Sequence, residues 1–489
     1  MSLMKIALRN SLLAGLLLSA ACTGEFDEMN TNPNGPEEVG PEVILPYALE
    51  KTVDRAWGHR TRNERVNIDL AMCWVQYWAR NIYTNEGDNY NVQPSVNSAT
   101  WNGFYSESLI NFKRIMLLTA PGADYENATY EGMSMVMTAW TYSLLTDIFG
   151  PIPYSDALKG TSDDPSFSPA YDDMETVYRG IIAMLDEANA KLMEGGPEAS
   201  AGDIMFGGDV LRWKKFGNSL RLKLMNRVVH KIPEYKAEMQ KMLDDPTTYP
   251  MFTSNDDYAY LQHTSSLPSN NEWHQVMRQD NRSDWSMSET LVDKLKALDD
   301  PRLEVYANAN PEGAYMGMPN GLPDAVATNY LGTASTIGDY FLRPEAPSII
   351  MSYSELLFVL AEAALDGDIS GKTAEEYFTM AVEASFEQYG LEMPAGYLEG
   401  MTADKATIMT QKWIALYGEG IEAWTEYRRT GYPVMPPDDP QSAFQNDGDV
   451  PTRIVYPTSE QSLNNANLQQ GISMLGTDNM HTELWWVEN

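Results

Sequence analysis

The chain has 489 residues, of which 43% are hydrophobic, and it carries 34 basic residues against 69 acidic ones. The hydrophobic content excludes global disorder, and the length is sufficient for a large buried core. A formal net charge of −35 argues against nucleic acid as a ligand, because nucleic-acid binding depends on Lys and Arg side chains that neutralise phosphates. The same charge argues against adsorption to anionic lipid.

The N-terminus has the parts of a secretory signal. Lys5 and Arg9 precede an apolar run from Leu12 to Leu18, and small residues then lead to Cys22. The run is shorter than the ~20 apolar residues that a membrane span needs. A cysteine at this place resembles a bacterial lipobox, although Leu18 stands one residue further from the cysteine than usual. We expect residues 1–21 to be removed and Cys22 to be lipidated; an ordinary cleaved signal is the alternative.

Behind the cysteine, residues 22–41 are polar, acidic and rich in turn formers, which is typical of a flexible spacer. Residues 42–489 are expected to form a single domain. The second cysteine, Cys73, lies in an apolar stretch and is predicted to be a buried thiol.

Helical periodicity dominates the rest of the chain. Apolar residues from Met133 to Ile148 recur on one face of a helix, and Asp172 with Glu175 forms a capping box that opens another. Further helices are predicted over Trp213–Val229, Ser288–Leu298, Ser352–Ala364, Thr373–Phe386 (with a capping box from Thr373 and Glu376) and Thr402–Tyr427. Extended segments are expected only near Tyr258–Leu261 and Ile454–Tyr456. The fold class is therefore mostly α.

Three connections are longer than ordinary loops, near residues 84–99, 246–284 and 433–451. Connections beyond ~12–15 residues often carry function, so these three loops are expected to be functional.

Sequence signals for catalysis are weak. The five histidines never occur at metal-ligand spacing, and no nucleophile motif is present. The stretch from Asp366 begins like a calcium loop, but its twelfth position is Tyr377 instead of glutamate. Paired carboxylates could serve a glycoside hydrolase, yet such pairs are unavoidable among 69 acids. We expect no catalysis, no metal and no cofactor.

Aromatic residues offer a better basis for ligand binding, because flat rings with polar rims stack on sugars or on peptide side chains. Trp74, Tyr77 and Trp78 share a helical face and are expected in the core, as is Trp101. The candidate ligand-binding residues lie in or beside the first two long loops; they are Tyr83, Asn89, Tyr90, Trp273, His274, Arg278, Arg282 and Trp285. The alternative is that they only anchor these loops.

Several phrases together resemble the SusD/RagB-type nutrient-binding lipoproteins of the Bacteroidetes. The most specific is Thr146-Asp147-Ile148-Phe149-Gly150-Pro151-Ile152-Pro153-Tyr154. Others are Phe26-Asp27-Glu28-Met29-Asn30, Trp213-Lys214-Lys215-Phe216-Gly217-Asn218, Asp300-Pro301-Arg302, Gln411-Lys412-Trp413, Arg428-Arg429-Thr430-Gly431-Tyr432-Pro433 and Trp485-Trp486.

The resemblance implies one α-rich domain, whose tetratricopeptide-like helix pairs form a right-handed scaffold and whose inserted loops build a shallow site. It implies anchorage to the outer membrane facing the cell exterior, and Glu25, Asp27 and Glu28 resemble an acidic surface-export tag. It also implies capture of oligosaccharide, or in some branches peptide, for a SusC-like TonB-dependent transporter. A surface glycoside hydrolase and a purely structural role are the competing hypotheses.

Overall fold

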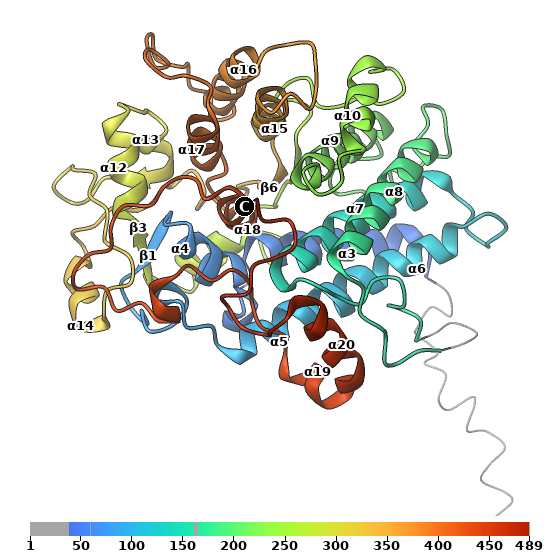
Figure 1. Ribbon diagram of the computed structural model, residues 1–489, viewed down its shortest axis with the longest axis horizontal. Helices are drawn as coiled ribbons and strands as arrows, with labels where there is room; N and C mark the ends of the chain where they lie inside the picture. Colours follow the sequence, from blue (N-terminus) through green and yellow to red (C-terminus); the bar gives the residue numbers. More distant parts are fainter. Residues whose placement is uncertain (1–38, 59, 161–164, 489) are drawn as a thin grey trace, which may run out of the picture. The chain divides into compact units, whose positions relative to one another are not determined.

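The computed structural model describes residues 39–58, 60–160 and 165–488, in which helices predominate and strands are few and short (Figure 1). The predicted signal peptide, Cys22 and most of the predicted spacer lie outside the described residues. Contacts group the described residues from Pro41 onward into one compact unit. Within the described ranges, no helix combines the length and the apolar character that crossing a membrane requires.

The α-helices of the described chain follow in order: α3 (Pro41–Trp57), α4 (Met72–Trp74), α5 (Pro94–Gly103), α6 (Ile110–Thr119), α7 (Ala128–Phe149), α8 (Met174–Lys191), α9 (Val210–Val228), α10 (Tyr235–Asp244), α11 (Glu272–His274), α12 (Glu289–Ala297), α13 (Leu303–Tyr306), α14 (Asp324–Ala327), α15 (Tyr353–Leu365), α16 (Ala374–Glu387), α17 (Lys405–Ala415), α18 (Gly420–Thr430), α19 (Thr458–Leu463) and α20 (Asn465–Leu475). Short 3-10 or π turns are η1 (Arg62–Glu64), η2 (Val66–Ala71), η3 (Gly87–Asn89), η4 (Phe104–Leu109), η5 (Gln275–Gln279), η6 (Thr328–Tyr330) and η7 (Asn446–Gly448).

The strands form three antiparallel pairs. These are β1 (Trp78–Arg80) with β3 (Trp285–Met287), β2 (Ala259–Leu261) with β6 (Ser348–Met351), and β4 (Ala307–Asn308) with β5 (Thr336–Ile337). The extended segment expected near Tyr258–Leu261 is confirmed as β2. The one expected near Ile454–Tyr456 is wrong: it is not a strand, although Ile454 N–H donates to the carbonyl of Ile148.

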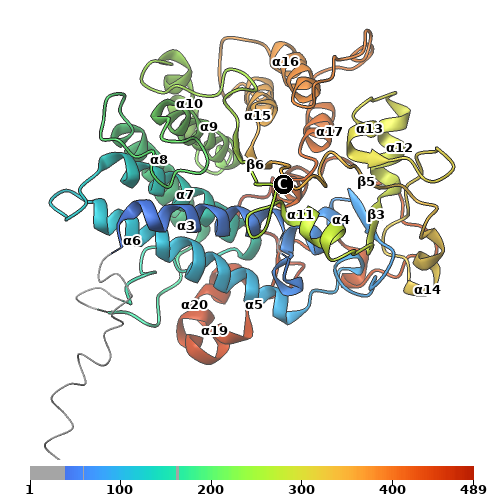
Figure 2. The same ribbon diagram turned by 180° about the vertical axis from the view of Figure 1, so that it is seen from behind.

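Successive helices pack side by side, as α6, α7, α8 and α9 do in one group and α15, α16 and α17 in another (Figures 1 and 2). Helix α7 is buried along nearly its whole length, because neighbours cover every face and not only the apolar stripe. The mostly α fold with helix pairs is confirmed.

A buried polar centre ties α7 to its neighbours. Asp147 accepts hydrogen bonds from Arg227 of α9 (2.7 Å), Tyr178 of α8 (2.6 Å) and the indole N–H of Trp486 (2.8 Å). Arg227 also pairs with Glu422 and with Glu426 of α18. Buried ions of this kind are stable only when each is paired and hydrogen-bonded, so the centre fixes how the helices meet.

Helix boundaries follow the sequence with two corrections. The capping box of Thr373 and Glu376 is confirmed, but α8 is capped by Asp173, whose carboxylate accepts from Thr176 N–H. Asp172 instead holds the preceding turn by accepting from Ser155 N–H at 2.7 Å.

The single helix expected over Thr402–Tyr427 is two helices, α17 and α18. The break falls at Gly418, whose φ of +104° is a conformation that L side chains rarely adopt.

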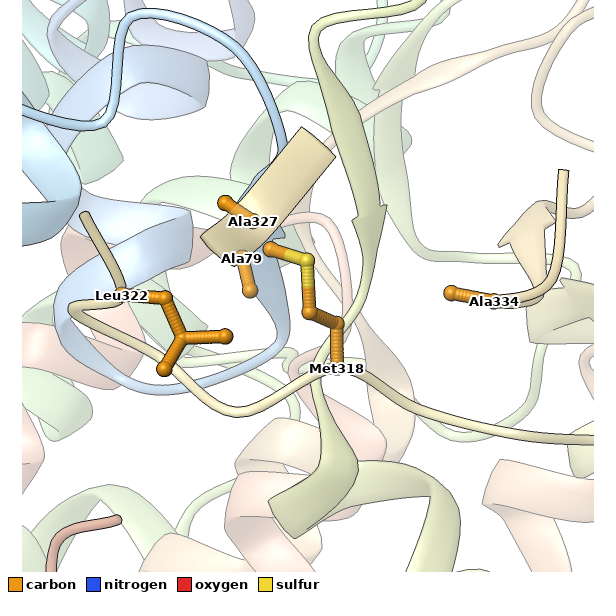
Figure 3. Close-up of a cluster of buried hydrophobic side chains, with 5 residues drawn as sticks. All are labelled: Ala79, Met318, Leu322, Ala327 and Ala334. Carbon is orange, nitrogen blue, oxygen red and sulfur yellow. The ribbon is translucent and has the colours of Figure 1, made fainter. Parts of the chain in front are cut away.

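Aromatic residues from Trp74 to Trp78 are buried as expected, although the helix there ends at Trp74 and Trp78 begins β1. Behind β1, a small apolar cluster supports this corner of the fold, and Figure 3 shows Met318 extending its side chain toward Ala79 and Ala327. Leu322 and Ala334 complete the cluster. The buried thiol predicted for Cys73 is also confirmed.

Candidate functional site

The β1–β3 pair brings together two of the predicted loop segments. Arg80 lies opposite Trp285 in the register, and one residue further Asn81 N–H donates to the carbonyl of Asp284 at 2.9 Å. The Asn81 side chain also donates to Ser286 Oγ at 2.9 Å. The residues after β1 therefore stand beside the residues before β3, although about 200 positions separate them in the chain.

A pocket of about 200 Å³ opens beside this pair, and Arg278, Arg282 and Trp285 line one side of it. We call it the arginine pocket. Its other side is formed by the segment from Leu331 to Leu342, which includes β5. This second side could not be predicted from the sequence, because residues 331–337 are small, polar or isolated apolar residues without a period or a motif.

Tyr83 stands next to the arginine pocket and is 40% exposed. The guanidinium carbon of Arg62 lies 4.8 Å from its ring centroid, and that of Arg282 lies 5.6 Å away. Tyr83 has a φ of +58°, and Asn281 in the pocket lining has a φ of +51°. Such backbone strain in residues other than glycine is often found at binding sites, where it holds a side chain in a working position.

Ion pairs organise the arginines around the site. The Asp284 carboxylate accepts from Arg282 and raises its pKa, and Asp339 pairs with Arg278. At the edge of the site, Arg60 donates to Asp280 at 2.9 Å and lowers the pKa of that carboxyl. The guanidinium groups are therefore held in place but remain partly exposed.

The other predicted ligand residues are placed differently. Trp273 is fully buried, donates its indole N–H to the carbonyl of Trp57 at 3.0 Å, and packs against Trp57 and Trp78. His274 is half-buried and its Nδ1 lies 2.8 Å from the carbonyl of Leu342, behind the pocket wall. Trp273 is thus a core residue, because its ring has no face left for a surface ligand.

Asn89 and Tyr90 are also buried. Tyr90 stacks on Phe444 with ring centroids 4.5 Å apart, and the carbonyl of Asn89 accepts from Gln445 N–H. These two residues anchor the third long loop on the first one. In this structure they are not available to a ligand at the arginine pocket, and Trp285 offers only the part of its ring that lines the pocket.

The arrangement is suited to binding. A partly exposed tyrosine, two guanidinium groups, hydroxyls and amides meet beside an apolar wall, which is the composition of many ligand sites. Among the described residues that line the arginine pocket, none is Asp or Glu, so the lining holds no acid/base pair for glycoside cleavage. Across the described ranges, no cluster of His, Cys, Asp and Glu could hold a metal ion.

Fold and pocket together describe a helix-rich protein with a small, arginine-lined pocket on its loops. Residues 33–457 match the model of the SusD-like family described as starch-binding and associating with the outer membrane. The chain belongs to this SusD-like family, as its sequence motifs predicted.

Solved structures agree with this assignment. One, named a chitin-binding protein, is 28% identical, with a TM-score of 0.79 over 92% of this chain and all of that one. A chitin-binding SusD homolog from Flavobacterium johnsoniae is 25% identical, with a TM-score of 0.79 over 91% and 99% of the two chains. A SusD homolog from Bacteroides uniformis is 23% identical and shares the fold, with a TM-score of 0.78 over 91% and 99%. No curated protein matches the chain.

Proposed function

We propose that this protein captures oligosaccharide at the cell surface and delivers it to a SusC-like TonB-dependent transporter, without catalysis. The observation that carries the proposal is the exposed ring of Tyr83 beside the arginine pocket, on a fold shared with chitin-binding relatives. Sugar rings stack on an exposed tyrosine, while guanidinium, amide and hydroxyl groups bind their oxygens. A shallow site made of weak contacts also permits release to a transporter.

Ligand binding can be tested by calorimetry with chito-oligosaccharides and malto-oligosaccharides on the full-length protein. Replacing Tyr83 by Ala is expected to weaken binding about three- to tenfold, because one stacked ring contributes on the order of 1 kcal/mol. Tyr47→Ala is the matched control, since Tyr47 is 46% exposed on α3 and also has a nearby cation, Lys51.

Three outcomes would contradict the proposal. Equal losses of ligand affinity in both variants would mean that Tyr83 does not contact the ligand. Binding of peptides but of no glycan would favour the peptide branch of the family, and new reducing ends after incubation would favour a glycoside hydrolase.

The anchor is the second part of the proposal. Lipid on Cys22 would hold the protein at the outer membrane, and the polar segment behind it would let the folded domain reach a transporter. Cells fed a radioactive fatty acid are expected to label the native protein but not Cys22→Ala. Cleaved, unlabelled native protein would instead indicate an ordinary signal peptide.

A further inference from the structure

The arginine pocket differs in charge from three larger surface pockets of the described chain. Its lining holds two arginines and no described carboxylate, whereas the other three each include acidic residues. Those acids are Asp173, Glu175 and Glu483 in one pocket, Glu289 and Asp293 in another, and Asp449 with Glu483 in the third. The chain has twice as many acidic as basic residues, yet the carboxylates that pair with the two lining arginines, Asp284 and Asp339, are not themselves part of the lining.

Ion pairs surround the pocket. Five arginines there pair with five carboxylates: Arg60 with Asp280, Arg62 with Glu86, Arg80 with Asp69, Arg278 with Asp339 and Arg282 with Asp284. A sixth arginine, Arg65, lies 5.9 Å from the Trp285 ring centroid. Charges beyond about 8 Å are largely screened at physiological ionic strength. The potential that a ligand meets at the pocket is therefore set by these local ion pairs and not by the distant acids.

Arg278 is the arginine best placed to change partners. Its side chain is 47% exposed and its partner Asp339 is 75% exposed, and exposed pairs of this kind contribute little to stability. A ligand anion can displace Asp339 at small cost. Guanidinium groups bind carboxylate and sulfate through two parallel hydrogen bonds, so the exchange would replace one charge-assisted pair by another.

The remaining lining suits a sugar that carries such a group. Asn281, Ser283 and Thr336 offer polar contacts, and Leu331 and Ile337 offer an apolar surface. The buried indole N–H of Trp285, also in the lining, finds no acceptor among the described residues. Ligand pockets for whole small molecules usually exceed 300 Å³, so a volume of about 200 Å³ fits one substituted sugar residue.

We infer that the arginine pocket selects oligosaccharides bearing an anionic substituent, a carboxylate or a sulfate. The inference rests on the proposed capture of glycans and names their chemical class. The inferred ligands differ from chitin, whose sugar residues are neutral.

Calorimetry on the full-length protein can test the inference with three ligands of equal length: an oligogalacturonate, a sulfated carrageenan oligosaccharide and a chito-oligosaccharide. At least one anionic ligand is expected to bind more tightly than the neutral one, and its affinity should fall as salt rises from about 0.05 to 0.3 M. Its binding to Arg278→Gln should be about three- to tenfold weaker.

Two further variants make the result specific. Asp339→Asn frees Arg278 from its competing carboxylate, so it should tighten binding of the anionic ligand about two- to fivefold and leave the neutral ligand unchanged. Arg179→Gln is the matched control, because Arg179 is also an exposed arginine paired with a carboxylate, but on α8. It should change no affinity.

Two results would overturn the inference, and they differ in what they leave standing. If the chito-oligosaccharide binds at least as tightly as both anionic ligands and Arg278→Gln binds normally, the charge selectivity is wrong while glycan capture holds. If none of the three glycans binds, the proposed capture of oligosaccharide fails with it.

Discussion

The carboxyl groups of Asp54 on α3 and Glu272 at the start of α11 share a hydrogen bond in the protein core. Burial raises the pKa of Asp54 to about 6 and raises that of Glu272 well above its usual range. Lys51 lies 3.8 Å from Asp54, and His263, whose pKa burial lowers to about 4, lies 3.6 Å from Glu272. The pair joins α3 to the segment that leads into the arginine pocket.

This pair should make stability depend on pH. The unfolded chain releases both protons at ordinary carboxyl pKa values, whereas the folded protein retains them, so stability falls as pH rises from about 4 through about 6. In the Glu272→Gln variant, the side-chain amide can still donate a hydrogen bond to Asp54, but it does not titrate. We expect the variant to gain about 1 to 3 kcal/mol over the native protein at pH 8 relative to pH 5, measured by urea unfolding. If the free energies of unfolding of the native protein and of the variant changed with pH in parallel, the prediction would be wrong.

Replacing Trp273 by Ala should act on folding and not on ligand contact. Removal of a fully buried tryptophan is expected to cost about 3 to 5 kcal/mol of unfolding free energy, because the cavity cannot close completely. Urea unfolding measures the loss, and calorimetry on the folded fraction should give native glycan affinity. A loss of affinity with native stability would restore Trp273 to the binding site.

Two glycines with positive φ allow the cost of backbone strain alone to be compared with the cost of strain plus a steric clash. Gly418 has a φ of +104°, and a Cβ there would lie 2.7 Å from the Trp57 ring, whereas Gly431 has a φ of +74° and no atom within 4 Å of an added Cβ. Gly431→Ala should therefore cost about 1 kcal/mol and Gly418→Ala clearly more. Thermal midpoints of both variants test the order; similar values would mean that Trp57 moves aside freely.

Much of the helical scaffold follows from the sequence. Residues Trp213–Val229 and Ser352–Ala364 agree with α9 and α15 within a few positions, because apolar period and capping residues act locally. The division at Gly418 was missed because the residues on both sides remain compatible with a helix. Only the approach of Trp57, more than 350 positions away in the chain, shows why the turn needs glycine.

The site was predictable only in part. Long loops with arginines and aromatic residues pointed to Tyr83, Arg278 and Arg282, which do lie together. The sequence could not separate them from Trp273 and Tyr90, because burial of an aromatic side chain depends on distant partners such as Trp57 and Phe444. The wall from Leu331 to Leu342 carries no local signal, because its residues form no motif and follow no apolar period.

The contact between Trp486 and Asp147 makes the packing around α7 depend on a residue more than 300 positions further along the chain. The indole of Trp486 is fully buried beside α7, so a fragment that lacks it would leave a cavity in the core. During synthesis, the core around Asp147 can therefore be completed only after Trp486 has been added. A change of sequence next to Trp486 would disturb its buried position beside α7.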